Sequence, residues 1–227
     1  RLRGVPALAD VDTSLALLQA VGADAQRCGA DICTRPADAL CGEIPDYLAG
    51  AMRSSVFYLA PLLCRAGYVR LPLPGGCRLG PRPVDIHLAG LASMGAEVEL
   101  EGIAVTLRRK GPLHGVDFTL RLPSVGATMT LLMAACCAQG RTVLRGAARE
   151  PEIGDMIAFL CACGADISGY GTSILTVQAA YSSFSAFPIK ALQSSIWISM
   201  VCTRLVSNSR VAYSGLALAL GIPSCSP

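Results

Sequence analysis

Residues 88–98, LAGLASMGAEV, place apolar side chains at helical spacing and then run into Gly95, an alanine, an acidic residue and an apolar residue that can begin a strand. The same pattern occurs at residues 15–25, LALLQAVGADA, and at residues 157–167, IAFLCACGADI. Glycine readily takes the positive φ found where helices end. Three helices are therefore expected to end at glycines spaced by 73 and then 69 residues: Gly22, Gly95 and Gly164. The chain is built on a repeat of about 70 residues.

An aspartate lies nine or ten residues before each of these glycines, where it can cap or charge the first turn of the helix: Asp12, Asp85 and Asp155. A second phrase recurs at residues 51–71 and 126–146, where a long amphipathic helix is followed by a glycine and a short strand. Alternating runs at residues 96–107 and Ile174–Gln178 supply further strands. The predicted fold is α/β, with pseudo-symmetric repeated helix-and-sheet units in a closed packing.

The composition excludes several classes of protein. The 227 residues are 52% hydrophobic, carry a net charge of +3 and are only 5% aromatic, so they lack the basic surface and stacking side chains of a nucleic-acid-binding protein. The longest apolar runs are well short of the roughly 20 residues that span a membrane. A soluble cytoplasmic protein with no membrane or nucleic-acid partner is expected. Because the sequence begins at Arg1 in the phrase RLRGVPALADVD, we also expect a preceding segment.

The eleven cysteines are odd in number, and several lie in apolar helical segments: Cys64, Cys136, Cys137, Cys161 and Cys163. This pattern favours buried reduced thiols over a disulfide scaffold. The sequence contains no C-x-x-C motif and only two histidines, so neither a structural metal nor another cofactor is expected.

Residues 71–90, LPLPGGCRLGPRPVDIHLAG, contain a cysteine whose neighbours differ from those of the helical cysteines. One more buried thiol is the simplest interpretation of Cys77. However, two glycines and four prolines around it predict an exposed loop. The nearby Arg78 and Arg82 would favour the thiolate and could, together with Arg53, hold phosphate or carboxylate groups. The loop therefore predicts a reactive thiol within an anion-binding site.

A second candidate site lies at residues 123–128, PSVGAT, which precede an apolar helix. The Ser124 hydroxyl and the first N–H groups of that helix would face an anion, although an ordinary helix cap explains the same residues. His87, near the start of the helix after the cysteine loop, suits a hydrogen-bonded surface or interface residue better than a catalyst. Glu150, Pro151 and Glu152 are typical of a helix start.

Three stretches together, residues 73–102, 124–135 and 146–172, resemble the UDP-N-acetylglucosamine 1-carboxyvinyltransferases, a family of enolpyruvyl transferases. The similarity runs from about Arg1 to Val177 and is most specific in the Gly-Gly-Cys loop. The related enzyme of aromatic amino-acid synthesis shares the fold but lacks that loop. The resemblance implies one domain of an inside-out α/β barrel, formed by residues 1–177, with residues 178–227 as a divergent tail.

The resemblance also implies an activity: transfer of enolpyruvyl from phosphoenolpyruvate to the 3-hydroxyl of UDP-N-acetylglucosamine, with release of phosphate, in peptidoglycan precursor synthesis. Cys77 matches the loop cysteine that donates a proton and forms an adduct with phosphoenolpyruvate. The substrate-binding residues implied in the same way are Arg53, Arg82, Pro83, Val84, Asp85, Ile86, His87, Ser124, Val125 and Gly126. No metal is needed, because arginines and lysines supply the positive charge at the phosphate.

The resemblance places a Lys-Asn pair of the site before Arg1 and a general-base aspartate in a second domain. Residues 179–227 match nothing expected of the family. They contain eleven serines and no acidic residue. An inactive partial chain or pseudoenzyme that keeps only UDP-sugar binding is therefore an alternative. Another is an unrelated thiol enzyme, with Cys77 as nucleophile and His87 or His114 as its base.

Overall fold

In the computed structural model, which describes residues 1–35, 37, 39–73 and 84–178, helices and strands alternate along the chain. The first part of the chain contains α1 (Ala9–Ala20), β1 (Asp24–Cys28), β2 (Asp31–Arg35), α2 (Asp46–Ala51), the 3-10 helix η1 (Arg53–Tyr58), α3 (Leu59–Ala66) and β3 (Tyr68–Pro72). The second part contains α4 (Asp85–Ser93), β4 (Glu97–Glu101), β5 (Ala104–Arg108), β6 (Asp117–Thr119), α5 (Val125–Cys137), β7 (Arg141–Arg145), α6 (Pro151–Ala162), β8 (Asp166–Ser168) and β9 (Ile174–Gln178). This is the α/β class predicted from the sequence.

The strands form three sheets with related pairing. In one sheet β3 pairs antiparallel with β5, and β5 pairs antiparallel with β4. In another, β7 pairs with β9 and β9 with β8 in the same antiparallel arrangement, while β6 joins β7 in parallel. The hairpin of β1 and β2 receives one isolated bridge in the same antiparallel sense, between Leu2 and Ile32 of β2. Each sheet thus joins a hairpin to a segment that precedes it in the chain.

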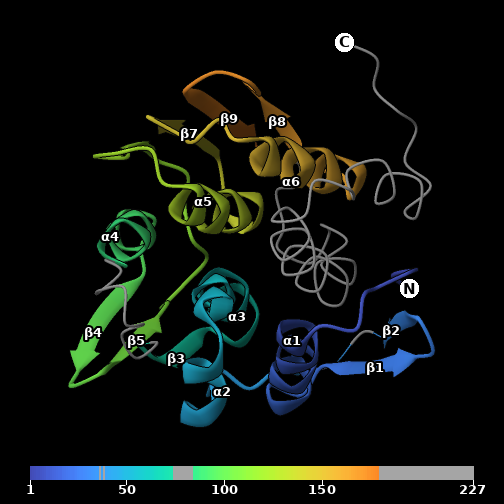
Figure 1. The fold of residues 1–227 in the computed structure, drawn as a ribbon. Helices are drawn as coiled ribbons and strands as arrows, with labels where there is room; N and C mark the ends of the chain where they lie inside the picture. Colours follow the sequence, from blue (N-terminus) through green and yellow to red (C-terminus); the bar gives the residue numbers. More distant parts are fainter. Residues whose placement is uncertain (36, 38, 74–83, 179–227) are drawn as a thin grey trace.

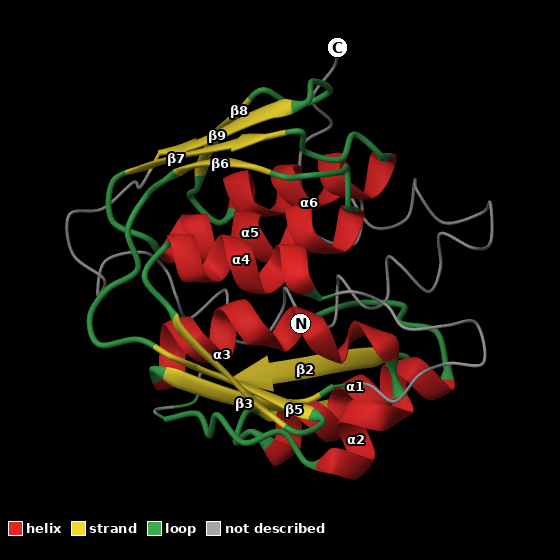
Figure 2. Cartoon of the chain, turned by 90° about the vertical axis from the view of Figure 1, so that its left-hand side faces the viewer, coloured by secondary structure: helices red, strands yellow, loops and turns green. Residues whose placement is uncertain are grey.

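The helices occupy the space between these sheets. Figure 1 shows the hairpin of β1 and β2, the sheet of β3–β5 and the sheet of β7–β9 around a central group of helices. In Figure 2 the four-stranded sheet lies over α5 and α6, and β3 and β5 lie on the opposite side of the helices. Most of α5 is buried, including every residue from Ala127 to Cys136. The helices therefore form the core, and the sheets cover it.

The three glycines predicted to end helices all have positive φ: +87° at Gly22, +102° at Gly95 and +99° at Gly164. Each lies one position beyond the C-cap of its helix. The alanine after each glycine donates its N–H back to the helix, over 2.9, 3.1 and 3.0 Å: Ala23 to Leu18, Ala96 to Leu91 and Ala165 to Leu160. This is the paired closing pattern of a glycine-ended helix, and it confirms the repeated signal.

The long helix predicted near residues 51–66 is divided. α2 ends at Ala51, Met52 is extended with φ −144° and ψ 142°, and η1 then leads into α3 at Leu59. Pro61 accounts for the late start of α3, because proline has no N–H to donate four residues back and is tolerated only in a first turn. The corresponding helix α5 has no proline and is continuous.

Two of the three aspartates expected at helix starts lie there. Asp12 and Asp85 are in the first turns of α1 and α4. Asp155 lies one turn further in, because α6 begins at Pro151 and carries Glu152 in its first turn. The expectation for Asp155 was therefore wrong, whereas the helix start predicted around Pro151 is confirmed.

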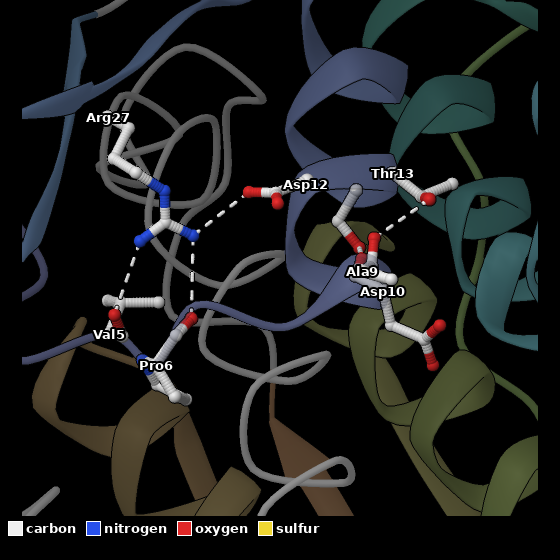
Figure 3. A network of polar contacts seen from close by, with 8 residues as sticks. Val5, Pro6, Ala9, Asp10, Asp12, Thr13 and Arg27 are labelled. Carbon is white, nitrogen blue, oxygen red and sulfur yellow. Dashed lines mark hydrogen bonds and ion pairs between the residues drawn. The ribbon is translucent and has the colours of Figure 1, made fainter.

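Arg27 ties the N-terminal segment to the first repeat (Figure 3). Its guanidinium donates to the carbonyl oxygens of Val5 and Pro6, at 3.2 and 3.4 Å, and pairs with the Asp12 carboxylate at 3.1 Å. The side chain of Thr13 donates to the Ala9 carbonyl over 2.9 Å within the same helix. One side chain of β1 thereby orients the entry into α1.

The cysteines described are all reduced, but they are not all buried. Cys64 and Cys136 are buried, Cys137 and Cys163 are partly exposed, and Cys161 is exposed. Within the described part of the chain, no group of three or more His, Cys, Asp or Glu side chains is placed to hold a metal ion. No helix among these residues has the length and apolar character to cross a membrane.

Candidate functional site

The segment that follows the cysteine loop enters α4 at Asp85. Val84 precedes the helix and is partly buried, and Asp85 is exposed, whereas Ile86 and His87 are each only 6% exposed. The four predicted site residues therefore divide into two outward-facing and two inward-facing positions. Only Val84 and Asp85 present surface at the start of this helix.

The start of α5 carries a capping side chain and backbone N–H groups that have no acceptor within the helix. Ser124 caps the helix, and its Oγ accepts a hydrogen bond of 3.3 Å from the Ala127 N–H. The first N–H groups of an α-helix have no acceptor within the helix, and those of Val125 and Gly126 occupy these positions. The first turn contains no acidic residue, so the positive end of the helix dipole faces no carboxylate of its own turn. The predicted cap at Ser124 is confirmed, and both residues after it are partly buried.

Three elements that carry predicted site residues meet at Gly126. A Cβ atom there would lie 3.2 Å from Cε1 and 3.3 Å from Nε2 of His87, and 3.8 Å from Cε1 of Phe57. His87 belongs to α4 and Phe57 to η1, which begins at Arg53. A side chain at position 126 would therefore fit only if the His87 ring moved by a few tenths of an ångström.

His87 also bonds to the next turn of α5. Its Nδ1 lies 2.9 Å from the Oγ1 of Thr130, and both side chains are buried. Thr128, between these contacts, accepts a 3.1 Å hydrogen bond on its Oγ1 from the Ala148 N–H. The start of α5 is therefore held on one side by α4 and on the other by the segment that leads into α6.

An exposed ion pair completes the connection between the two helix starts. The Nη2 atom of Arg121 lies 2.6 Å from Oδ2 of Asp85, and the two side chains are 55% and 54% exposed. Arg121 lies three residues before the Ser124 cap. The pair therefore links the start of α4 to the loop that precedes α5, at the surface above the buried contact between His87 and Thr130.

The remaining predicted site residues lie outside what the structure describes. They are Cys77, Arg82, Pro83 and the side chain of Arg53. The described residues therefore bring together Asp85, His87, Ser124 and Gly126 from two segments almost 40 residues apart. The contacts of Cys77 with them stay a prediction.

A comparison with known protein families shows to which family the chain belongs. The sequence model of the family described as EPSP synthase (3-phosphoshikimate 1-carboxyvinyltransferase) matches residues 1–185. The chain belongs to the EPSP synthase family. Every described site residue falls within the matched range.

Individual members of the family are similar over most of this chain. A protein of Nitratidesulfovibrio vulgaris named UDP-N-acetylglucosamine 1-carboxyvinyltransferase is 49% identical over 175 residues, which are 77% of this chain and 41% of its own. Proteins of the same name from Oleidesulfovibrio alaskensis and Klebsiella pneumoniae are 47% and 43% identical, each over 78% of this chain and 42% of their own. The chain thus spans about two fifths of the length of these curated relatives.

Solved structures support the fold of the EPSP synthase family. The enolpyruvyl transferase NikO from Streptomyces tendae matches 77% of this chain and 41% of its own, with a TM-score of 0.62 and 22% identity. An EPSP synthase from Acinetobacter baumannii matches 74% of this chain and 39% of its own, with a TM-score of 0.53 and 19% identity. At these identities the likeness concerns the fold alone.

Several residues that shape the site were not foreseen from the sequence. Thr130 and Phe57 lie in apolar helical segments and look like ordinary core residues until α4 and η1 are packed against α5. Thr130 does lie four residues after Gly126, on the same face of α5, which was the one available signal. Arg121 gave none, because its pairing with Asp85 depends on the packing of the two helices.

Proposed function

We propose that residues 1–177 form the loop-bearing catalytic domain of a UDP-N-acetylglucosamine 1-carboxyvinyltransferase. The observation that carries this proposal is the identity of 43–49% to relatives of that name, over a range that includes the Gly-Gly-Cys loop and both helix starts. The family alone leaves the acceptor open, since its description names a 3-phosphoshikimate enzyme. The cysteine loop favours the UDP-sugar as the acceptor. The proposed location of the reaction is the cytoplasm.

The proposed fold of the domain is an inside-out α/β barrel with pseudo-symmetric units. Its support is the recurrence of one pairing scheme, in which a hairpin receives an antiparallel strand from the preceding unit. The three equivalent helix ends at glycine support the same repeat. Residues 178–227 are proposed to be a divergent tail outside this domain.

The proposed reaction is an addition followed by an elimination. The 3-hydroxyl oxygen of the sugar bonds to C2 of phosphoenolpyruvate, and the Cys77 thiol gives a proton to C3. The hydroxyl proton passes to a base that the resemblance assigns to a second domain. C3 then gives a proton to the Cys77 thiolate as the bond between C2 and the phosphate oxygen breaks, which restores the double bond and releases phosphate. Arg53 and Arg82 are proposed to hold the phosphate and carboxylate groups.

The two described helix starts fit the UDP-sugar part of this proposal. Ser124, Val125 and Gly126 would direct hydroxyl and N–H groups at the ligand, in a turn with no competing carboxylate. The segment from Arg82 to Ile86 would contact it from the side of α4. His87 is buried, so its proposed contribution is to set the position of α5 relative to α4.

The proposal is tested by two measurements on the 227-residue chain. Phosphate release is followed with phosphoenolpyruvate and either UDP-N-acetylglucosamine or 3-phosphoshikimate, and binding of each acceptor is measured by calorimetry. We expect UDP-N-acetylglucosamine to bind, Ser124→Ala to weaken binding, and Cys77→Ser to abolish any phosphate release. Preference for 3-phosphoshikimate would overturn the proposed acceptor.

One observation favours the alternative of a binding-only chain, namely that the chain spans about two fifths of the relatives' length. Under this alternative UDP-N-acetylglucosamine binds with no phosphate release, and Cys77→Ser leaves binding unchanged. Turnover by the chain alone contradicts this alternative. An unrelated thiol enzyme would instead show alkylation of Cys77 that neither proposed substrate slows.

A further inference from the structure

Two cysteines share the outer face of the hairpin formed by β1 and β2. In the register of the two strands, Cys28 lies opposite Asp31 and Cys33 lies opposite Gln26. Residues that lie opposite each other, and those two positions further along a strand, project from the same face of a sheet. Ile32, between Asp31 and Cys33, is fully buried and projects from the other face. Both cysteines therefore lie on the face directed away from the core.

The two thiols are neighbours on this face and are open to solvent. Cys28 and Cys33 occupy diagonal positions, which lie about 7–8 Å apart in an antiparallel pair, with somewhat less between the Cβ atoms. The Sγ of Cys28 lies 3.9 Å from the carbonyl oxygen of Gln26, so the side chain of Cys28 leans towards the pair that Gln26 forms with Cys33. Both cysteines are reduced and partly exposed. An ion or reagent in solution can thus reach both.

This spacing suits a bridging metal ion better than a disulfide. A disulfide brings the two Cβ atoms to about 3.8 Å, which a diagonal pair reaches only if the backbone moves. Two metal–sulfur bonds of about 2.3 Å each let one ion span sulfurs that are up to roughly 4.6 Å apart. Cysteines at diagonal positions that lean towards each other can therefore hold an ion between them without a change in register.

The number of available ligands selects the kind of ion. Among the residues that the structure describes, no group of three or more His, Cys, Asp or Glu side chains is placed around a metal position. The Asp31 carboxylate opposite Cys28 is already engaged, since it accepts hydrogen bonds from Nε of Arg1 at 2.8 Å and from the Gly4 N–H at 3.0 Å. Zinc, which takes four ligands in structural sites, is therefore unsuited. Soft thiolates without further ligands favour a soft monovalent ion such as Cu(I).

The charge of the surroundings is compatible with bound thiolates. Nη2 of Arg1 lies 2.7 Å from Oδ2 of Asp31, so its guanidinium lies on the same face, beside Cys28. A neighbouring cation favours the thiolate form of a cysteine. The guanidinium can also offset the single negative charge that two thiolates and one monovalent ion carry together.

We propose that Cys28 and Cys33 form a two-coordinate site for Cu(I) on the outer face of the first hairpin. Each thiol gives its proton to solvent and forms one bond to the ion, so two protons are released and the oxidation state of the ion does not change. Figure 1 shows this hairpin on the opposite side of the molecule from α4. The site is therefore separate from the proposed substrate site, and the proposal is independent of the proposed function.

The test titrates the full chain with Cu(I) under anaerobic conditions, in competition with the chromophoric chelator bathocuproine disulfonate. Relative to the unsubstituted chain, Cys28→Ser and Cys33→Ser should each lose one equivalent of tightly bound Cu(I). The double variant should lose no more than either single variant, because one ion needs both thiols. Cys41→Ser is the matched control, since Cys41 is exposed and reduced but lies outside the hairpin, and it should bind Cu(I) as before. Loss of the same equivalent in Cys41→Ser would overturn the proposal.

A second measurement uses only the unsubstituted chain, so poor folding of a serine variant does not affect it. One equivalent of Cu(I) is added before brief alkylation with iodoacetamide, and mass spectrometry of the digested chain compares the modified fractions. Cu(I) should slow the alkylation of Cys28 and Cys33 together and leave that of Cys41 unchanged. Protection of only one of the two, or of neither, would overturn the proposal. A third sulfur ligand in the X-ray absorption spectrum of bound copper would also overturn it.

Discussion

The Nδ1 atom of His87 lies 2.9 Å from the Oγ1 atom of Thr130, so a buried hydrogen bond joins the first turn of α4 to the second turn of α5. The histidine ring also lies against Gly126, one turn earlier in α5. These two contacts of one ring therefore fix how far apart the starts of α4 and α5 lie and how they are placed along the helix axes. The geometry of the proposed site depends on this spacing.

Removing the hydroxyl partner of His87 is expected to destabilise the fold. Thr130→Val keeps the shape of the side chain but leaves a buried imidazole nitrogen without this bond, which costs about 1–3 kcal/mol. Thr130→Ser, which keeps the hydroxyl, should lose less. Urea unfolding of both variants measures the difference. A larger loss in Thr130→Ser than in Thr130→Val would show that the methyl group, rather than the hydrogen bond, matters.

Filling the space at Gly126 is expected to separate α4 from α5. An alanine Cβ would lie 3.2 Å from the His87 ring, so Gly126→Ala should cost about 1–3 kcal/mol through crowding and should weaken UDP-N-acetylglucosamine binding. Gly50→Ala is the control, because Gly50 is also helical and has nothing within 4 Å of the added Cβ. Glycine to alanine within a helix gains about 0.5–1 kcal/mol, and Gly50→Ala should show this gain. Unfolding and calorimetric titration compare the two, and equal stabilities would argue against crowding.

Substitutions at two of the glycines that end helices can distinguish the cost of backbone strain from the cost of steric crowding. Gly164 and Gly95 have φ of +99° and +102°, but a Cβ at Gly95 would lie 2.9 Å from Cε1 of His114, whereas one at Gly164 meets nothing within 4 Å. Gly164→Ala should cost about 1–2 kcal/mol from the left-handed conformation alone. Gly95→Ala should cost more, as thermal unfolding can measure. Equal losses at the two positions would mean that His114 moves away freely.

The stability of α6 should depend on pH through Asp155. Burial, followed by the neighbouring Glu152, raises the pKa of Asp155 above its usual 3.8. Ionisation of Asp155 is therefore less favourable in the folded chain than in the unfolded chain. The stability that the protonated form contributes is fully present below pH 3.8 and is lost as the pH rises through the folded-state pKa. Asp155→Asn should be more stable than the parent at pH 7, with the difference narrowing as the pH falls towards 3.8. The exposed Asp166→Asn is the control, and an equal gain there would point to net charge instead.

The ion pair of Asp85 and Arg121 should matter little for stability, because both side chains are more than half exposed. Asp85→Asn and Arg121→Gln each remove the pair and should each cost less than about 1 kcal/mol, decreasing with salt. If Asp85 contacts the UDP-sugar, only Asp85→Asn should weaken binding strongly in calorimetric titration. Equal weakening by both variants would indicate that the pair acts by positioning the helix.

Local signals in the sequence were enough for the features that depend on neighbouring residues. The closing glycines, such as Gly95, and the Ser124 cap are set by backbone conformation and by bonds to residues three to six positions away, so they could be predicted. The division of the helix before Pro61 was missed because the apolar spacing continues through it. The partner of His87 lies 43 residues away in sequence, and no local pattern specifies such a pair.

The sheets have a consequence for how the described chain unfolds. β5 and β9 are central strands, and each bonds on one side to a strand of the preceding unit and on the other to its own hairpin partner. If one unit unfolds, its own sheet is therefore lost. The sheet of the next unit also loses the strand that the unfolded unit contributes. Successive units should exchange their amide hydrogens together and unfold in one cooperative step, although each has the sequence pattern of a separate piece.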